Sequence, residues 1–472
     1  MDVSEKIPIN LGLFGHIDSG KTAVAEVLSE IISTAGIDAH PQSKQRGITI
    51  DLGFTSFVLD EYLVTLVDAP GHADLLKISA SSIEIIDLAL VVIDINKGPQ
   101  IQTGEHLVMI ESLGVEDIIV ILNKTDLYNG ELDKVIEKTR NFFESTSFGR
   151  NIPIYAVSAK EKTGFEALKQ GIYENIIGLD VERSNSDDII VPIDHHFKVK
   201  GIGSVLTGTI VTGTVKVGND LSILPINAKG RVKNIQIFHQ NVESARAGNR
   251  VGLNMKDIDV KNIYRGCYAT DNITAFDFCR IADVKVTKSS LFKPDTNFGT
   301  QLHITIGMAT SIGKIYPYRE ESGKKIRNSV SGDQTEFKAF LWFNERVLMR
   351  KIRNKMLLSR LDLPPTTLRI LGSAELVDIL EKPPILYKYK TKVGSITNPN
   401  HSQGIVCTGL AQSIAGARKI VGRELEAPFT KIKDTFGTKG AVIVGAEKGK
   451  EDIHKNERVV MKELRSFQLK NI

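Results

Sequence analysis

The chain has 472 residues, of which 42% are hydrophobic, and at roughly 100 to 200 residues per domain this length predicts three or four domains. No stretch approaches the roughly 18 charge-free apolar residues that a membrane span requires, and the start MDVSEKIPIN lacks the apolar core of a signal peptide. We therefore expect a cytoplasmic protein without membrane contact. The cysteines, Cys267, Cys279 and Cys407, are too few and too scattered for a disulfide framework or a C-x-x-C zinc site.

The formal net charge of +4 is unevenly distributed along the chain. Residues 386–472 contain 16 Lys and Arg and 8 Asp and Glu, which gives this part +8 and leaves −4 for the rest. Such an imbalance can be a solvated face, but in a compact terminal domain it favours a polyanionic partner such as nucleic acid.

The first 180 residues alternate short apolar runs, such as YLVTLVDAP and LALVVIDI, with segments of helical period, such as GKTAVAEVLSEIISTAG. Continuous apolar strands are buried on both faces, which predicts an α/β domain with a parallel-rich sheet and helices on both faces. Functional loops are then expected at the carboxyl ends of the strands.

The segment GHIDSGKT lies between the first such strand and the first helix, and it matches the phosphate-binding loop G-x-x-x-x-G-K-[ST]. Glycines let backbone N–H groups approach phosphates, Lys21 can reach the β and γ oxygens, and Thr22 can bind Mg²⁺. A chance match in a chain of this length is uncommon, and the later motifs decide the assignment.

Three further motifs follow predicted strands in the expected order. DAPGH begins with Asp68, which can hold Mg²⁺ through water, and NKTD contains Asp126, whose carboxylate can accept two hydrogen bonds from a guanine edge. SAK (158–160) follows the last strand. Adenine offers no such pair of donors, so the motifs predict a site for GTP or GDP.

Between these motifs, RGITIDLGF (46–54) contains Thr49, whose hydroxyl can bind Mg²⁺ when the γ-phosphate is present, so we expect a nucleotide-dependent switch there. The residues assigned to guanine-nucleotide binding are Gly15, His16, Ile17, Asp18, Ser19, Gly20, Lys21, Thr22, Asp68, Gly71, Asn123, Lys124, Asp126, Ser158, Ala159 and Lys160. The residues assigned to Mg²⁺ are Thr22, Thr49 and Asp68, the last through water.

Taken together, the five motifs resemble those of the translational GTPases, the family of elongation factor Tu, over at least residues 8–270. The resemblance implies that His72 orients the attacking water and that Ile17 and Ile48 form an apolar gate in front of it. It also implies that Lys21 and Mg²⁺ neutralise charge in the transition state. Ser19 stands where elongation factor Tu has a histidine, which leaves details of gating open.

The texture changes near residue 185 to short β-branched strands split by glycine. IDHHFKVKGIGSVLTGT and ARAGNRVGL resemble the stretches that wall the amino-acid pocket in the second domain of that family. Where factors for ordinary amino acids have a Glu-Asp pair and an asparagine, this chain has Asp194, His195 and Arg250, with Phe197 close by. Such a pocket suits an anionic aminoacyl group, and selenocysteine is the natural candidate because a selenol is more acidic than a thiol. Strand alternation alone would also allow His195 to be a partly buried core residue.

RGITIDLGF and the length of about one additional small domain resemble the selenocysteine-specific elongation factors. The resemblance implies GTP-dependent delivery of selenocysteinyl-tRNA to the ribosome at UGA codons. It also implies contact with a selenocysteine-insertion hairpin in mRNA, directly or through an RNA-binding protein, and a monomeric state. The strand-like C-terminal extension favours the archaeal or eukaryotic type.

We therefore expect a GTPase domain at 1–182 followed by three β-barrel-like domains: 183–272 with the aminoacyl pocket, 273–384 with tRNA contacts, and 385–472 with RNA contacts. The segment 344–361 is ambiguous between helix and strand, and 316–334 is predicted to be an exposed loop.

Two alternatives were weighed. The γ subunit of initiation factor 2 uses similar motifs, but its cysteine knuckle has no counterpart, because no cysteine precedes Cys267. A metabolic GTPase of the sulfate-adenylylation type would not need Arg250 beside His195.

Overall fold

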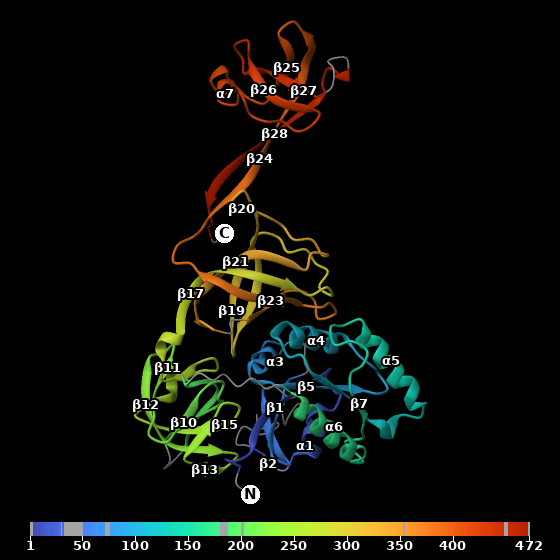
Figure 1. Cartoon of the computed structure of the whole chain (residues 1–472), viewed down its shortest axis with the longest axis vertical. Helices are drawn as coiled ribbons and strands as arrows, with labels where there is room; N and C mark the ends of the chain where they lie inside the picture. Colours follow the sequence, from blue (N-terminus) through green and yellow to red (C-terminus); the bar gives the residue numbers. More distant parts are fainter. Residues whose placement is uncertain are drawn as a thin grey trace. The chain divides into compact units, whose positions relative to one another are not determined.

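The computed structural model describes residues 3–29, 31–32, 51–70, 76–179, 187–199, 203–352, 355–447 and 452–470. The chain forms two compact units. The first comprises Met1–Pro317 and Ser329–Glu381, and the second comprises Tyr318–Asn328 and Lys382–Ile472. Figure 1 shows the elements of each unit, coloured along the sequence.

A seven-stranded sheet organises the first 180 residues. Its strands are β1 (Ile7–Phe14), β2 (Ile31–Ile32), β3 (Gly53–Leu59), β4 (Tyr62–Asp68), β5 (Leu88–Asp94), β6 (Ile118–Asn123) and β7 (Ile154–Ala156). Their order in space is β2-β3-β4-β1-β5-β6-β7, and β4, β1, β5, β6 and β7 are parallel. Because parallel strands end at the same edge of a sheet, the loops that follow them meet there.

Helices cover both faces of this sheet (Figure 1). They are α1 (Lys21–Leu28), α3 (Leu76–Ser82), α4 (Ile101–Leu113), α5 (Leu132–Glu144) and α6 (Phe165–Gly178). Neighbouring residues of β5 face opposite sides, so Leu90 packs in the core that contains α1 and α6, and Val91 in the core that contains α4 and α5. The continuous apolar strands of the sequence therefore correspond to a sheet that is buried on both faces.

A closed β-barrel follows. Its strands are β8 (Ile190–Val199), β9 (Gly203–Thr209), β11 (Asp220–Leu224), β12 (Ala228–Ile237), β15 (Arg250–Lys256) and β16 (Tyr268–Thr270), with the short β10 (Thr214–Lys216), β13 (Gln240–Val242) and β14 (Ser244–Arg246) beside them. The order β11-β16-β8-β9-β15-β12 closes through pairing of β11 with β12. Fully buried apolar residues such as Ile193, Leu206 and Leu253 form its core.

A second closed barrel contains β17 (Phe276–Lys288), β18 (Thr300–Ile306), β19 (Ala309–Glu321), β21 (Glu336–Arg350), β22 (Lys355–Ser359) and β23 (Ile370–Ile379). Pairing of β18 with β19 closes it. The ambiguous segment 344–361 contains the end of β21 and all of β22, so it is strand and not helix where the structure describes it.

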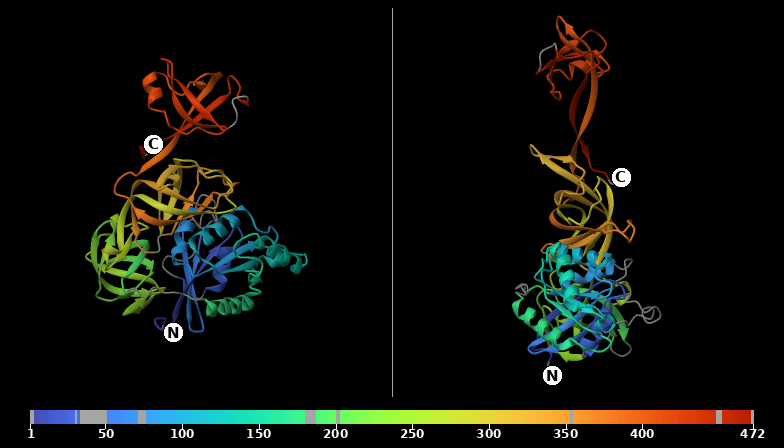
Figure 2. Two further views of the ribbon diagram at one scale, coloured as in Figure 1. Left: turned by 45° about the horizontal axis from the view of Figure 1, so that its top comes forward. Right: turned by 90° about the vertical axis from the view of Figure 1, so that its right-hand side faces the viewer.

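The terminal unit consists of β20 (Lys324–Arg327), β24 (Ile385–His401), β25 (Gly404–Thr408), β26 (Phe429–Phe436), β27 (Ala441–Ala446), β28 (Arg458–Gln468) and the short α7 (Ile414–Arg418). β24 pairs with β28 from Ile385↔Gln468 to Ser395↔Arg458, a long antiparallel pair seen from two further sides in Figure 2. Ile396, Cys407 and Ile432 are buried in the core of this unit.

The expectation of an exposed loop at 316–334 is wrong. The segment contains the end of β19 and the whole of β20, and Tyr316 and Val330 are fully buried. Its charged residues flank apolar ones at strand spacing, so composition alone concealed a hairpin.

The fold class predicted from the sequence, an α/β GTPase-type domain followed by β-barrel domains, is confirmed. Among the described helices, none combines the length and apolar character needed to cross a bilayer. All three cysteines are buried and free.

Candidate functional site

The loop between β1 and α1 has the backbone conformation that its two glycines require. Gly15 and Gly20 have φ of +140° and +90°, where a side chain would be strained. A Cβ on Gly15 would lie 2.2 Å from the Val92 carbonyl oxygen, and one on Gly20 would lie 2.3 Å from Asn123 Nδ2. The loop is therefore fitted closely against β5 and the end of β6.

Lys21 and Thr22 open α1 at the base of this loop. Lys21 is 6% exposed and donates hydrogen bonds to the carbonyl oxygens of Gly15 (3.1 Å) and His16 (3.0 Å). Burial lowers the pKa of Lys21, which Asp68 partly opposes. The buried hydroxyl of Ser19 has no hydrogen-bond partner within the described part of the chain, so a polar ligand in the loop would satisfy it.

Thr22 and Asp68 form a pair of oxygen donors. The Thr22 hydroxyl donates to Asp68 Oδ2 at 2.7 Å, and Asp68, at the end of β4, is fully buried. Hydroxyl and carboxylate oxygens are the ligands that Mg²⁺ prefers, so this donor set fits the ion.

The NKTD and SAK motifs meet at the ends of β6 and β7. Asn123 donates to the carbonyl oxygen of Ser19 (3.0 Å) and accepts from the N–H of Ala159 (3.1 Å). Asp126 accepts from the Ser158 hydroxyl at 2.6 Å. The phosphate loop and the two predicted base-binding motifs are thus joined by hydrogen bonds, while Lys160 makes only an exposed contact with Glu161.

Four predicted site residues, Ile48, Thr49, Gly71 and His72, lie outside the described residues. Ile17 lies inside them, and its N–H donates to Gln102 Oε1 at 3.3 Å.

Helix α4 contributes contacts that the sequence analysis missed. His106 is fully buried, and its Nδ1 accepts from the N–H of Gly15 at 3.0 Å. Burial lowers the pKa of His106 to about 3, so the imidazole is neutral and can accept this bond. Glu105 pairs with Arg369 of the second barrel. Nothing in the helical pattern marks these two positions, because a buried polar residue on a helix cannot be assigned a partner from spacing alone.

In the first barrel, Arg250 at the start of β15 lies against Asp194 of β8. Both terminal nitrogens of Arg250 donate to Asp194, one of them at 3.1 Å, and the two side chains are 5% and 0% exposed. Burial would raise the pKa of Asp194, but Arg250 and His195 outweigh it and hold this pKa well below its usual range.

A β-bulge at Asp194 explains the position of His195. The register between β8 and β9 shifts between Ile193 and His195, so regular alternation is interrupted there. His195 Nδ1 then lies 2.9 Å from Asp194 Oδ1, and its Nε2 lies 3.3 Å from Asp51 Oδ2. Burial would lower the pKa of His195, but these two carboxylates raise it, so the protonated form is favoured.

The GTPase domain completes this cluster. Arg265 donates to Asp51, and burial would raise the pKa of Asp51, but hydrogen bonds and charge from His195 and Arg265 lower it to about 2. The guanidinium carbon of Arg250 lies 3.2 Å from the centre of the Phe54 ring. With His195 protonated, Arg250 and Arg265 bring the cations to three, against the carboxylates Asp51 and Asp194. The cluster is therefore cationic overall, as the sequence suggested, although most of its charge is paired.

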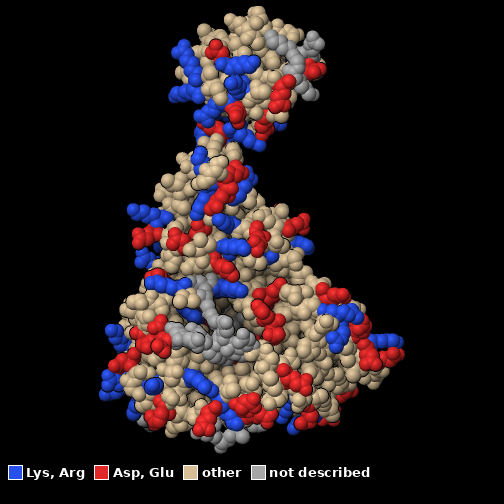
Figure 3. Space-filling model, viewed as in Figure 1, with Lys and Arg blue, Asp and Glu red and all other residues tan. Residues whose placement is uncertain are grey.

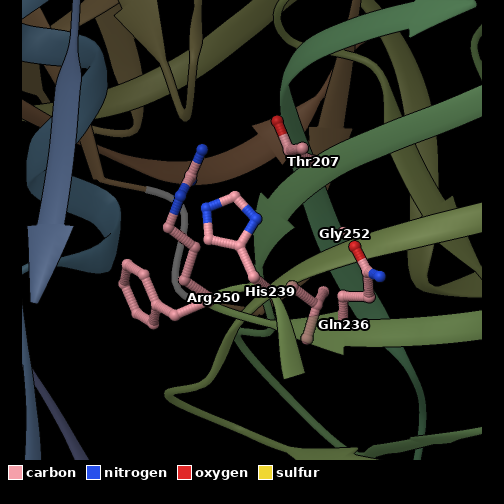
Figure 4. A pocket seen from close by; sticks show the side chains of 7 residues that line it. Thr207, Gln236, His239, Arg250 and Gly252 are labelled. Carbon is pink, nitrogen blue, oxygen red and sulfur yellow. The ribbon is translucent and has the colours of Figure 1, made fainter. Parts of the chain in front are cut away.

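A small cavity opens beside this cluster, shown in Figure 4. Among the described residues, its lining consists of Thr207, Gln236, Phe238, His239, Arg250, Val251 and Gly252. Arg250 is the only predicted pocket residue in that lining. Asp194 and His195 lie behind it, and Phe197 lies opposite Val205 on β9.

Three family models match the chain in succession. The elongation factor Tu GTP-binding domain matches residues 6–177, elongation factor Tu domain 2 matches 203–270, and domain III of the archaeal selenocysteine-specific elongation factor matches 278–380.

A selenocysteine-specific elongation factor from Methanocaldococcus jannaschii is 40% identical over 97% of this chain and 98% of its own length. The chain belongs to the selenocysteine-specific elongation factors. The mouse factor is 38% identical over 66% of this chain and 56% of its own length. The crystal structure of translation elongation factor SelB from Methanococcus maripaludis with the GTP analogue GppNHp matches with a TM-score of 0.80 at 34% identity, over 98% of this chain and 99% of that one.

This selenocysteine-specific elongation factor is thus a guanine-nucleotide-binding GTPase of the translation apparatus. Family membership sets aside both the initiation-factor and the metabolic alternatives. The order of motifs after β1, β4, β6 and β7 was sufficient to predict the nucleotide, because each lies at a strand end.

One nucleotide-site residue of this elongation factor was missed although a signal existed. Asp94 ends β5, as Asp68 ends β4, and its Oδ2 lies 2.9 Å from Lys124 Nζ. Lys124 also donates to the carbonyl oxygen of Asp18. Burial would raise the pKa of Asp94, but hydrogen bonds from Lys124 and Asn96 lower it. Asp94 therefore holds Lys124 across the phosphate loop.

We expect Asp94→Asn to raise the dissociation constant for GDP by about five- to thirtyfold, the equivalent of roughly 1–2 kcal/mol for a hydrogen bond to a charged group. Fluorescence titration with a labelled GDP measures this. Asp133→Asn, at an exposed position on α5, is the matched control and should bind GDP as the wild type does. An unchanged affinity in Asp94→Asn would remove Asp94 from the nucleotide site.

Proposed function

We propose that this GTPase binds selenocysteinyl-tRNA and delivers it to the ribosome at recoded UGA codons, hydrolysing GTP to GDP. The observation that carries the proposal is the cationic cluster of Asp51, Asp194, His195, Arg250 and Arg265 beside the barrel cavity. A selenolate would lower the free energy of a site with excess positive charge, whereas the neutral hydroxyl of serine would not. The name of the M. jannaschii relative supports the same cargo.

In this proposal the phosphate loop binds the phosphates, Lys21 neutralises charge on the β and γ oxygens, and Asp126 selects guanine. Thr22, Thr49 and Asp68 would hold Mg²⁺, which neutralises phosphate charge when bound. His72 would orient the attacking water, with Ile17 and Ile48 as the gate before it. These last roles rest on the resemblance of the motifs.

The terminal domain is proposed to contact RNA. Lys and Arg side chains gather on the face of this unit seen in Figure 3, and residues 386–472 have a net charge of +8. Salt-dependent attraction to a phosphate backbone follows from such charge. The proposed partner is the selenocysteine-insertion hairpin, bound directly or through an RNA-binding protein. We further propose that the factor is a monomer and acts in the cytoplasm.

The test is protection of the aminoacyl ester from hydrolysis in the presence of a non-hydrolysable GTP analogue. Selenocysteinyl-tRNA is compared with the same tRNA carrying serine, which isolates the aminoacyl group from the tRNA body. Selective protection of the selenocysteinyl ester is the expected result. Equal protection of both esters would contradict recognition of the cargo by the barrel.

We expect Arg250→Ala to reduce the discrimination between these esters by about 1.5–3 kcal/mol, the range for a hydrogen bond to a charged group. Arg231→Ala is the matched control, because Arg231 lies on the same barrel in an exposed pair with Asp220. A variant that still separates the two esters as the wild type does would show that Arg250 is not part of the recognition.

A further inference from the structure

The barrel cavity contains a histidine that is not His195. Gln236 on β12, Gly252 on β15 and Thr207 on β9 are paired across three neighbouring strands and form one row of its lining. Phe238 and His239 form the two-residue loop between β12 and β13, since Ile237 pairs with Gln240. In Figure 4 the imidazole of His239 lies beside the side chain of Arg250.

This loop is unfavourable for folding. Phe238 and His239 have φ of +41° and +69°, so two bulky residues adopt the left-handed conformation in succession. Two-residue hairpin loops of this kind strongly prefer Asn-Gly, because glycine accepts positive φ without strain. Backbone strain of this sort persists where the surroundings hold it and is concentrated at functional sites.

Gly252 is a second costly choice at the same cavity. It lies inside β15, where a glycine weakens a strand. A Cβ there would meet nothing closer than Val205 Cγ1 at 3.9 Å, so packing does not require the glycine. Its missing side chain instead leaves the cavity open at this point. Two features that reduce stability thus coincide at one cavity.

We propose that His239 is the histidine that recognises the aminoacyl side chain, with Gly252 keeping space for it, and that His195 is a positioning residue. Both ring nitrogens of His195 lie within hydrogen-bond distance of carboxylates, and the terminal nitrogens of Arg250 are bound by Asp194. An anion that enters the cavity beside Arg250 therefore meets a second nitrogen-bearing side chain, His239. This inference rests on the proposed function.

The test is His239→Gly in the full chain with a non-hydrolysable GTP analogue, measuring affinity for selenocysteinyl-tRNA and for the same tRNA carrying serine. Because glycine relieves the strain, the unfolding temperature should stay the same or rise, while the preference for the selenocysteinyl ester falls on the order of tenfold or more. A merely structural histidine would give the opposite combination. An unchanged preference, or an equal loss for both esters, would overturn the inference.

Two further variants keep the test decisive. Asp257→Gly relieves a left-handed residue of the same barrel (φ +64°) that lies outside the cavity lining, and it should leave both affinities unchanged. Gly252→Ala should fold and should weaken binding of charged but not of uncharged tRNA. Unaltered binding in Gly252→Ala would overturn the cavity as the cargo site. A wild-type chain that shows no preference between the esters would instead overturn the proposed function itself.

Discussion

Replacing Asp194 with asparagine is expected to lower the free energy of unfolding of the first barrel by about 3–5 kcal/mol. The substitution keeps the shape of the side chain but removes its charge, so Arg250 would remain 5% exposed without its compensating carboxylate. His195 would lose one of its two acidic partners at the same time. Breaking a buried pair from one side costs far more than the pair itself contributes, because the remaining charge stays desolvated.

Urea unfolding followed by circular dichroism measures this loss, with hydrogen exchange of β8 and β15 assigning the transition to the barrel. Asp220→Asn is the matched control. Asp220 also binds an arginine through two bonds of 2.8 Å, but both of its side chains are exposed, so little change is expected. Similar losses in the two variants would show that burial of the Asp194 pair is unimportant.

The same cluster predicts a pH dependence. The pKa of Asp194 is lowered on folding, so its contribution to stability is present above the ordinary value of 3.8 and is lost as the pH falls through the folded value. The pKa of His195 is raised, so its contribution is complete below 6.5 and is lost as the pH rises through the folded value. The stability difference between wild type and Asp194→Asn should therefore be widest between these two values.

Glu105→Gln is expected to cost a similar amount, about 3–5 kcal/mol, at the contact between α4 and the second barrel. Glu105 is fully buried and accepts from the Arg369 backbone N–H (3.2 Å), Nε (2.8 Å) and a terminal nitrogen (3.0 Å). Arg369 is 4% exposed, so its charge would have no access to water after the substitution.

A double-mutant cycle with Arg369→Gln separates the interaction energy from the cost of leaving one partner buried. Glu111→Gln, at an exposed position on the same helix, is the control for the helix itself. If Glu105→Gln and Arg369→Gln gave strictly additive losses, the pair would not contribute as an interaction.

The sequence by itself determined the nucleotide and the class of fold. Each motif of the nucleotide site lies within a short segment next to a strand, and parallel strands end at one edge, so local order along the chain predicts proximity in space. Apolar runs and β-branched strands likewise identify the sheet and the barrels, because each pattern reflects burial of a continuous stretch.

The tertiary structure alone decided the polar contacts between distant segments. Asp51 meets His195 across 144 residues and Glu105 meets Arg369 across 264, and no periodicity relates such positions. The bulge at Asp194 changes which side chains meet, and the left-handed conformation of His239 places it beside Arg250, although alternation of the sequence predicts neither. Local patterns specify which faces are buried, whereas the partners of buried charges depend on how whole elements pack, and that is fixed only when the chain has folded.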